Sequence, residues 1–344
     1  MRAALIYGPR DLRVVTVDTP SLQQDEVLVR VYACGVCGTD VHTYRTGKDP
    51  AGEMPVLAGH EFSGEVVEVG GEVEGVTVGD RVVGTGFRPC GECYWCQQGR
   101  YDRCPSPRVP GSGLDGAFAE YVVVPQPVMG RMFFHIPDGM DWDEAATIEP
   151  LSVACFDVRR ARIRPDETVV VLGAGMIGQC VAQVCKAQGA SRVIVSEPNA
   201  ARRQMAGSLG ADAVVDPLET DLAAFVQDIT SGEMAGVVFE CAGSPVAFQQ
   251  IPLVLRPFGR IMQVAVYEEG LNLLPDVIYR MFQMGNFTWQ GCGGQRWDMA
   301  VDLVANGKVK TGRLVTYKFP LESAREAFET QLASPEAIKV LVKP

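Results

Sequence analysis

The pattern of apolar and polar residues changes character about halfway along the chain. The first half contains short runs rich in β-branched residues, and glycine or proline interrupts each run. These runs predict strands at residues 27–32, 64–70, 80–84 and 119–125. Short strands separated by turn residues indicate a barrel-like β domain.

From about residue 165, fully apolar strands alternate with helical segments. Strands are expected at 168–172, 192–196 and 236–240, and helices at 175–188 and 202–209. This alternation predicts βαβ units and therefore a parallel, doubly wound sheet. A later helix at 296–306 and a terminal strand at 338–342 are expected to return to the first domain. The predicted boundaries are residues 1–152 with 289–344 for the β domain, and residues 153–288 for the doubly wound domain.

The length of the chain agrees with this division, because 344 residues exceed what one core usually organises. No apolar run approaches the ~20 residues that a membrane span needs. The first residues lack the pattern of a signal peptide, so a cytoplasmic protein is expected. A formal net charge of −11 opposes binding to the phosphate backbone of nucleic acids.

Four of the eleven cysteines lie in one short segment, separated by two, two and seven residues: Cys90, Cys93, Cys96 and Cys104. A short loop with this spacing can wrap one tetrahedral ion, and four thiolates leave no position open for a substrate. The segment therefore predicts a structural zinc site. An iron–sulfur cluster is the alternative, but no further cysteines cluster nearby and nothing indicates electron transfer, so zinc is favoured.

A second candidate metal site is dispersed along the chain and consists of Cys37, His60, Glu61 and Glu149. Thiolate, imidazole and carboxylate groups are all good zinc ligands. Three protein ligands with one exchangeable water are typical of a catalytic zinc. Taken alone, a cysteine such as Cys37 is more often a core residue, and a histidine such as His60 is more often a hydrogen-bonded structural residue.

A glycine fingerprint connects a buried strand to a helix, with the residues Gly173, Gly175, Met176, Ile177 and Gly178. The first glycine permits a tight turn, the second lets the backbone approach a pyrophosphate, and the third lets the helix pack on the strand. The helix N-terminus adds positive partial charge. The segment therefore predicts a dinucleotide-binding site.

The next expected strand ends in Glu197, about 20 residues past the fingerprint. A carboxylate at this position accepts hydrogen bonds from ribose hydroxyls and repels the extra phosphate of NADP, which favours NAD. Arg202 and Arg203 lie nearby and argue in the opposite direction, unless they only solvate a helix.

In this order, the motifs resemble the zinc-containing medium-chain dehydrogenase/reductase superfamily over essentially the whole chain. Segments 35–42 (Gly-Val-Cys-Gly-Thr-Asp-Val-His), 59–61 (Gly-His-Glu) and 148–153 (Ile-Glu-Pro-Leu-Ser-Val) are similar to the sorbitol, threonine and 2,3-butanediol dehydrogenase branch. The resemblance implies a GroES-like β-barrel catalytic domain, a Rossmann domain that binds NAD, and a homotetramer or homodimer.

The resemblance also implies residue roles. The catalytic zinc would be held by Cys37, His60 and a carboxylate, either Glu61 or Glu149. The four clustered cysteines would hold the structural zinc. The expected NAD-binding residues are Gly173, Gly175, Gly178, Glu197 and Arg202. Thr39 and His42 are placed for a relay that carries the alcohol proton to water.

The implied substrate is a secondary alcohol such as a diol, polyol or sugar alcohol, oxidised reversibly to the ketone. The segment Trp289–Trp297 lacks the Arg-Tyr pair expected of sorbitol dehydrogenases, and Thr85–Cys90 lacks the histidine expected of threonine dehydrogenases. A threonine-type amino-alcohol dehydrogenase is the alternative among enzymes. A zinc-stabilised binding protein that has lost catalysis is the alternative of another class.

Overall fold

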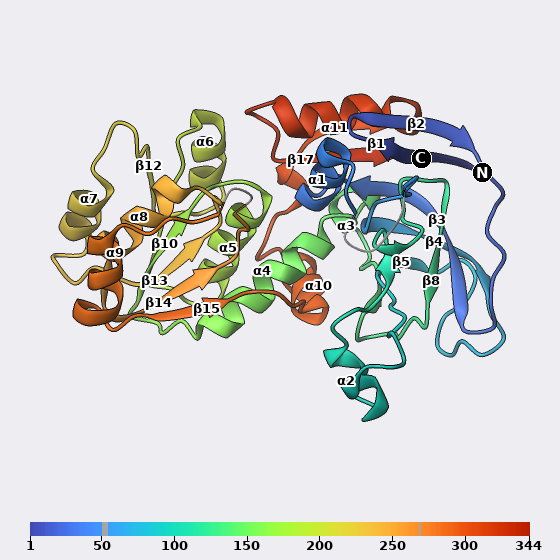
Figure 1. The fold of residues 1–344 in the computed structure, drawn as a ribbon, viewed down its shortest axis with the longest axis horizontal. Helices are drawn as coiled ribbons and strands as arrows, with labels where there is room; N and C mark the ends of the chain where they lie inside the picture. The colour runs from blue at the N-terminus through green and yellow to red at the C-terminus, as the bar shows by residue number, and fades with distance from the viewer. Residues whose placement is uncertain (50–53, 268–269) are drawn as a thin grey trace. The chain divides into compact units, whose positions relative to one another are not determined.

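The computed structural model describes residues 1–49, 54–267 and 270–344. The chain divides into two compact units, one formed by Met1–Glu149 with Thr311–Pro344 and the other by Pro150–Lys310. Each unit has its own secondary structure and core (Figure 1).

The first unit is built mainly from strands. Its strands are β1 (Arg2–Gly8), β2 (Asp11–Thr16), β3 (Glu26–Gly35), β4 (Glu61–Val69), β5 (Arg81–Gly84), β6 (Val109–Pro110), β7 (Gly113–Leu114), β8 (Tyr121–Pro125), β9 (Phe133–His135), β16 (Val315–Pro320) and β17 (Lys339–Lys343). Its helices are α1 (Gly38–Thr46), α2 (Tyr94–Gln97), α3 (Trp142–Ala145) and α11 (Ala324–Ala333), with short helical turns at Tyr101–Arg103, Gly312–Leu314 and Leu321–Ser323.

The main sheet of this unit has the order β16-β17-β3-β4-β5-β9, and β8 pairs with β3 beside this path. The ten-residue β3 organises the sheet, because it pairs antiparallel with β4, β8 and β17. The core contains an aromatic group in which the Phe328 ring meets Tyr44 and Phe118 edge to face. The C-terminal strand therefore lies inside a sheet whose other strands come largely from the first half of the chain, and the predicted β domain is confirmed.

The second unit alternates strands and helices. Its strands are β10 (Thr168–Leu172), β11 (Arg192–Ser196), β12 (Ala213–Val215), β13 (Ala235–Glu240), β14 (Leu255–Gln263) and β15 (Thr288–Gly291). Its helices are α4 (Ile148–Ala161), whose first two residues fall in the first unit, α5 (Met176–Ala187), α6 (Ala200–Ser208), α7 (Leu222–Ile229), α8 (Pro245–Val254), α9 (Pro275–Tyr279), the π-helical turn Arg280–Met284 and α10 (Trp297–Ala305).

The six strands of this unit form one parallel sheet in the order β12-β11-β10-β13-β14-β15. The chain winds outward from β10 to β12 and then returns to β13, so helices cover both faces. Figure 1 shows α5 and α6 on one side of the sheet and α7 and α8 on the other. Every residue of β10 and β13 is buried, as expected of central strands in a sheet covered on both faces. The doubly wound fold is confirmed.

The structure differs from the sequence prediction at the second domain boundary. Residues 289–310 were expected in the first domain, but β15 pairs with β14 and extends the parallel sheet. The backbone N–H of Arg296, directly before α10, donates to the Ser152 carbonyl of α4 at 2.9 Å. The second unit therefore continues to Lys310. An apolar pattern predicts the type of an element but not the sheet that it joins.

None of the helices in the described part of the chain is long and apolar enough to cross a membrane.

Candidate functional site

Three of the predicted zinc ligands converge in the first unit. Cys37 lies at the start of α1, just after β3, and His60 directly precedes Glu61, the first residue of β4. The antiparallel register sets Glu61 opposite Gly35. The ligand atoms of Cys37, His60 and Glu61 all lie within 4.8 Å of one another. A Cβ on Gly35 would meet Glu61 Oε2 at 2.2 Å, so glycine is needed there for the carboxylate to approach.

Asp40, a residue of α1, contacts both Cys37 and His60 and orients them. It is 3% exposed, and its Oδ2 accepts a hydrogen bond from the Cys37 backbone N–H at 2.9 Å. Its Oδ1 lies 3.7 Å from Nδ1 of His60. Carboxylates in this position fix the ring orientation of a metal-binding histidine.

The negatively charged groups around His60 favour the protonated form of its imidazole. Burial acts against a charged imidazole, but the negative charges of Asp40 and Cys37 outweigh burial and raise the pKa of His60 well above its ordinary value. A thiolate, an imidazole and carboxylates that together attract a cation form a donor set that suits zinc.

Glu61 also forms a buried ion pair with Lys339 of β17. The Lys339 Nζ lies 2.5 Å from Oε2 of Glu61 and also donates to the Val36 carbonyl at 3.1 Å. The side chains are 4% and 1% exposed. Burial opposes the charge on Lys339, yet Glu61 and Cys37 raise the pKa of Lys339. The carboxylate is therefore held in place from the C-terminal end of the chain.

The other candidate residues of this site lie at different depths. Glu149, in the first turn of α4, is 8% exposed, and its charge acts on both His60 and Lys339. Glu149 is not among the three residues whose ligand atoms cluster. Thr39 is exposed in the first turn of α1, and His42 follows three residues later with partial exposure. Residues three apart lie on the same face of a helix, as a relay between them requires.

The four clustered cysteines also meet in the structure. Their sulfur atoms lie within 4.8 Å of one another. Cys90 Sγ is 3.9 Å from Cys96 Sγ, and the Cys90 backbone N–H donates to Cys104 Sγ at 3.3 Å. The backbone N–H groups of Cys93 and Glu92 lower the pKa of Cys90 to about 7, whereas burial raises the pKa of Cys96 to about 12. The arrangement matches four thiols around one tetrahedral ion.

The glycine fingerprint forms the turn between β10 and α5. Gly173 has a φ of 91°, which a residue with a Cβ rarely adopts. A Cβ on Gly178 would lie 2.0 Å from the Gly173 carbonyl oxygen, so the helix can approach the strand only with glycine there. Nothing lies within 4 Å of a Cβ built on Gly175, which caps α5. Met176 and Ile177 form the first turn of α5. The turn therefore leaves open backbone at a helix N-terminus, where a pyrophosphate binds.

Glu197 follows β11 at the same edge of the sheet. Its Oε2 accepts a hydrogen bond from the Ala174 N–H at 2.7 Å, and its Oε1 accepts from the Asn199 N–H at 2.9 Å. Arg203 does not point freely into solvent, because it pairs with Asp216 at 2.8 Å and donates to the Glu197 carbonyl. The Arg202 carbonyl accepts from the Gln179 side chain at 2.9 Å. The carboxylate thus lies against the fingerprint, and the guanidinium of Arg203 is engaged by Asp216 and the Glu197 carbonyl.

Sequence reasoning missed three residues that shape these sites. Asp40 was part of a quoted motif without a role, and Lys339 lies in the C-terminal strand, 278 residues from Glu61. Glu240 ends β13 fully buried, and its Oε1 accepts hydrogen bonds from the backbone N–H groups of Ala242 and Gly243. A charged residue inside an apolar strand pattern is the signal that could have pointed to Lys339 and Glu240.

Two family models match the chain. Residues 23–138 match the alcohol dehydrogenase GroES-like domain, and residues 177–306 match the zinc-binding dehydrogenase model. The first match lies within the first unit and the second within the second unit.

Named relatives are similar along the whole chain. The chain is 36% identical to 2-dehydro-3-deoxy-L-galactonate 5-dehydrogenase of Pseudoalteromonas atlantica, with 100% of this chain and 98% of the relative covered. It is 36% identical to L-threonine 3-dehydrogenase of Pyrococcus abyssi, with coverages of 97% and 94%. The crystal structure of 2R,3R-butanediol dehydrogenase from Bacillus subtilis superposes with a TM-score of 0.88 at 32% identity, with coverages of 100% and 99%.

These matches span both units and agree with the two candidate zinc sites and the dinucleotide fingerprint. All three relatives are dehydrogenases, which confirms the predicted class of enzyme. The chain is a member of the zinc-dependent alcohol dehydrogenase family, the enzymes that oxidise CH–OH groups with a nicotinamide dinucleotide.

Proposed function

We propose that this enzyme oxidises a secondary hydroxyl of a small diol, polyol or sugar alcohol to the ketone with NAD, and catalyses the reverse reaction. The observation that carries the proposal is the convergence of Cys37, His60 and Glu61 within 4.8 Å in a family that binds zinc. A zinc ion held by these residues would supply a Lewis acid that makes the hydroxyl of an alcohol more acidic.

The protein residues then have separate tasks. Cys37 and His60 hold the metal, while Asp40 fixes the His60 ring and Lys339 fixes Glu61. Glu61 and Glu149 both remain candidates for the third ligand. Glu61 already belongs to the clustered donors, and the charge of Glu149 reaches His60.

The proton of the alcohol leaves through Thr39 and His42. Thr39 is exposed and His42 lies on the same face of α1, one helical turn further on. Histidine is suited to this step because its ordinary pKa lies near neutrality. The residues that would hold the dinucleotide are Gly173, Gly175, Met176, Ile177, Gly178, Glu197 and Arg202, and the bound dinucleotide would supply the hydride acceptor.

Cys90, Cys93, Cys96 and Cys104 bind a second zinc, which holds the loop around α2. This loop contains only two short helical elements, α2 and the turn Tyr101–Arg103. A metal therefore provides the stability that an apolar core provides elsewhere. None of the eleven cysteines, all of which lie in the described residues, forms a disulfide, which agrees with a reducing compartment and supports the cytoplasmic assignment.

A homodimer or homotetramer is the proposed assembly. β15 ends the parallel sheet, and exposed apolar side chains gather in this strand and the segment before it: Leu274, Ile278, Tyr279, Phe282, Met284 and Trp289. A second copy of the chain could cover them along the same edge. Light scattering on the purified enzyme tests this, and a Phe282→Asp variant that stays in the same oligomer as wild type would contradict it.

The catalytic proposal is tested by measuring NAD reduction with diols, sugar alcohols, sugar acids and L-threonine as substrates. A diol or polyol is expected to give the highest kcat/KM. A preference for L-threonine would favour the amino-alcohol alternative, which the relative from Pyrococcus abyssi keeps open.

Metal content separates a catalytic from a purely structural zinc. Wild type is expected to contain two zinc ions per chain, and His60→Ala one. A His60→Ala variant that keeps two zinc ions and full turnover would show that the reaction takes place elsewhere.

A further inference from the structure

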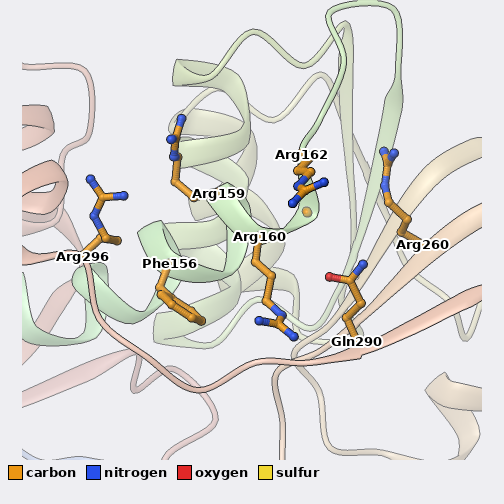
Figure 2. Close-up of a pocket in the computed structure, with 8 residues that line it drawn as sticks. Phe156, Arg159, Arg160, Arg162, Arg260, Gln290 and Arg296 are labelled. Carbon is orange, nitrogen blue, oxygen red and sulfur yellow. The ribbon is translucent and has the colours of Figure 1, made fainter. Parts of the chain in front are cut away.

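A cavity of about 770 Å³ lies within the second unit, beside the C-terminal half of α4. Its lining residues come from three parts of the unit: Phe156, Arg159, Arg160, Ala161, Arg162, Arg260, Gln290 and Arg296. In Figure 2, Arg160 and Arg162 lie with Gln290 and Arg260 around one end, while Phe156 and Arg296 lie at the other. We call this cavity the arginine pocket.

The carboxylates near the arginine pocket do not neutralise the positive charge of its five guanidinium groups. Arg260 pairs with Glu167, but the same carboxylate also serves Arg164 and Arg256. Arg296 pairs with Asp298. The remaining three arginines, 159, 160 and 162, form no ion pair with any residue that the structure describes. The pocket therefore concentrates positive charge in a chain whose net charge is −11.

One nearby carboxyl, Asp157, does not change this balance. Asp157 is fully buried, and neither of its oxygens has a hydrogen-bond partner among the described residues. Burial raises the pKa of Asp157 to about 7, while Cys292 and Arg160 act weakly in the other direction. Because its pKa is raised, the Asp157 carboxyl carries less negative charge near neutral pH than an ordinary aspartate and so neutralises Arg160 only in part.

Favourable interaction with the helix dipole accounts for only part of this cluster. Cations near the C-terminus of a helix interact well with its dipole, which suits Arg159 and Arg160 in the last turn of α4. Arg260 and Gln290, however, lie in β14 and β15 and reach the same cavity. Arg162 has a φ of 50°, in the left-handed region that glycine occupies more easily. The chain thus places an arginine at the pocket where the backbone favours glycine.

The arginine pocket is separate from the dinucleotide site. The fingerprint turn follows the carboxyl end of β10, and Gln263 ends β14 at the same edge. Arg260 lies three residues before Gln263, which corresponds to ~10 Å along a strand. Arg162 directly follows α4, at the end of that helix away from Glu149, and none of the residues that line the pocket belongs to the fingerprint segment 173–178.

We propose that the arginine pocket binds a small anion that carries two or more phosphate groups. Guanidinium groups contact phosphate oxygens through paired hydrogen bonds, and the Gln290 amide adds a further donor. Several arginines spread over one cavity match charges at more than one point of a ligand, whereas a single sulfate or phosphate would leave some of them unpaired. The volume lies in the ~300–1,000 Å³ range of small-molecule sites.

The test is a titration of the zinc-loaded enzyme with inorganic pyrophosphate by calorimetry at low salt, with NAD present at saturation so that the cofactor site is occupied. Saturable binding of about one pyrophosphate per chain is expected. The Arg160→Gln/Arg162→Gln variant should bind at least tenfold more weakly. Both side chains are exposed, so the fold should persist, and thermal unfolding checks this. Lys308→Gln removes an exposed charge outside the pocket and should bind within twofold of wild type.

Two further ligands define the chemistry. A hexose bisphosphate that binds more tightly than pyrophosphate would identify an organic ligand, and the reverse order an inorganic one. The proposal is overturned if wild type shows no saturable binding, if NAD abolishes it, if inorganic phosphate binds as tightly as pyrophosphate, or if Lys308→Gln weakens it as much as the arginine variant.

Discussion

Lys339 has the largest expected effect among single residues outside the proposed ligand set. Replacing it with glutamine leaves the buried Glu61 carboxylate without its cation, which costs about 3 kcal/mol in the free energy of unfolding. Lys318→Gln is the matched control, because Lys318 is 54% exposed and pairs with Asp143, which Lys343 also contacts. Its cost should stay below about 1 kcal/mol. Urea unfolding compares the two, and equal losses would show that the buried pair has no special role.

The buried Asp157 carboxyl leads to a prediction of how the free energy of unfolding depends on pH. The pKa of its carboxyl is raised from 3.8 to about 7 in the folded protein, so the folded chain keeps a proton that the unfolded chain releases. Stability contributed by this proton is complete below about pH 4 and is lost as the pH rises toward 7. Wild type should therefore lose about 2 kcal/mol relative to Asp157→Asn between pH 5.5 and pH 8. Urea midpoints at both values check this, and parallel curves for the two proteins would contradict it.

For single residues, the sequence predicted the candidate metal ligands well, but it did not predict the residues that position those ligands. Cys37, His60 and the four clustered cysteines carry metal chemistry in their side chains, so their spacing alone was informative. Asp40 and Lys339 act only through neighbours that the fold brings to them. Asp157 follows an apolar segment of α4, and its full burial depends on packing that no local pattern reports.

Among the elements, the turn from β11 to α6 is the one that we expect to determine whether the enzyme uses NAD or NADP. Glu197 lies against the fingerprint, and Arg203 is engaged by Asp216. Wild type is expected to prefer NAD over NADP at least tenfold in kcat/KM. Asp216→Asn releases Arg203 and should narrow that ratio, whereas Glu219→Gln, an exposed change in the following turn, should not. Steady-state kinetics with both cofactors measure the ratios, and a wild-type preference for NADP would reverse the assignment.

The loop around α2 should depend on its metal. Cys93→Ser is expected to lower zinc content from two ions to one per chain and to expose residues 90–104 to proteases. Cys292→Ser, a half-buried cysteine outside the cluster, should keep both ions. Metal analysis and limited proteolysis measure these changes. Two zinc ions in Cys93→Ser would remove the support for a structural site.

The sequence largely predicted which segments form helices and strands, but it did not predict which strands pair with one another. Apolar runs and glycine positions indicated β10, β11, β13 and α5 with small errors at the ends, because local sequence largely sets these features. The position of β15 was not predictable in this way, since its four residues, Thr-Trp-Gln-Gly, are mostly exposed and form no apolar run. Only its pairing with β14 shows that it continues the parallel sheet.

At the scale of the whole molecule, the first unit depends on the C-terminal strand β17. Val340, Leu341 and Val342 are fully buried in β17, and their burial contributes about 6 kcal/mol, a large share of the stability of an ordinary domain. A chain that stops at residue 337 should therefore fail to hold the first unit together. Limited proteolysis should degrade residues 1–149 while a fragment near 150–310 survives. Equal resistance of both units would contradict this dependence.

The origin of β17 also has a consequence for how the enzyme is made. A ribosome synthesises residues 150–310 as one uninterrupted stretch, so the dinucleotide unit can fold before translation ends. The first unit must wait for the last strand, and with it for Lys339, before Glu61 gains its partner. A prematurely terminated or clipped polypeptide would retain the dinucleotide fold but lack a finished catalytic centre, so incomplete copies would be inert.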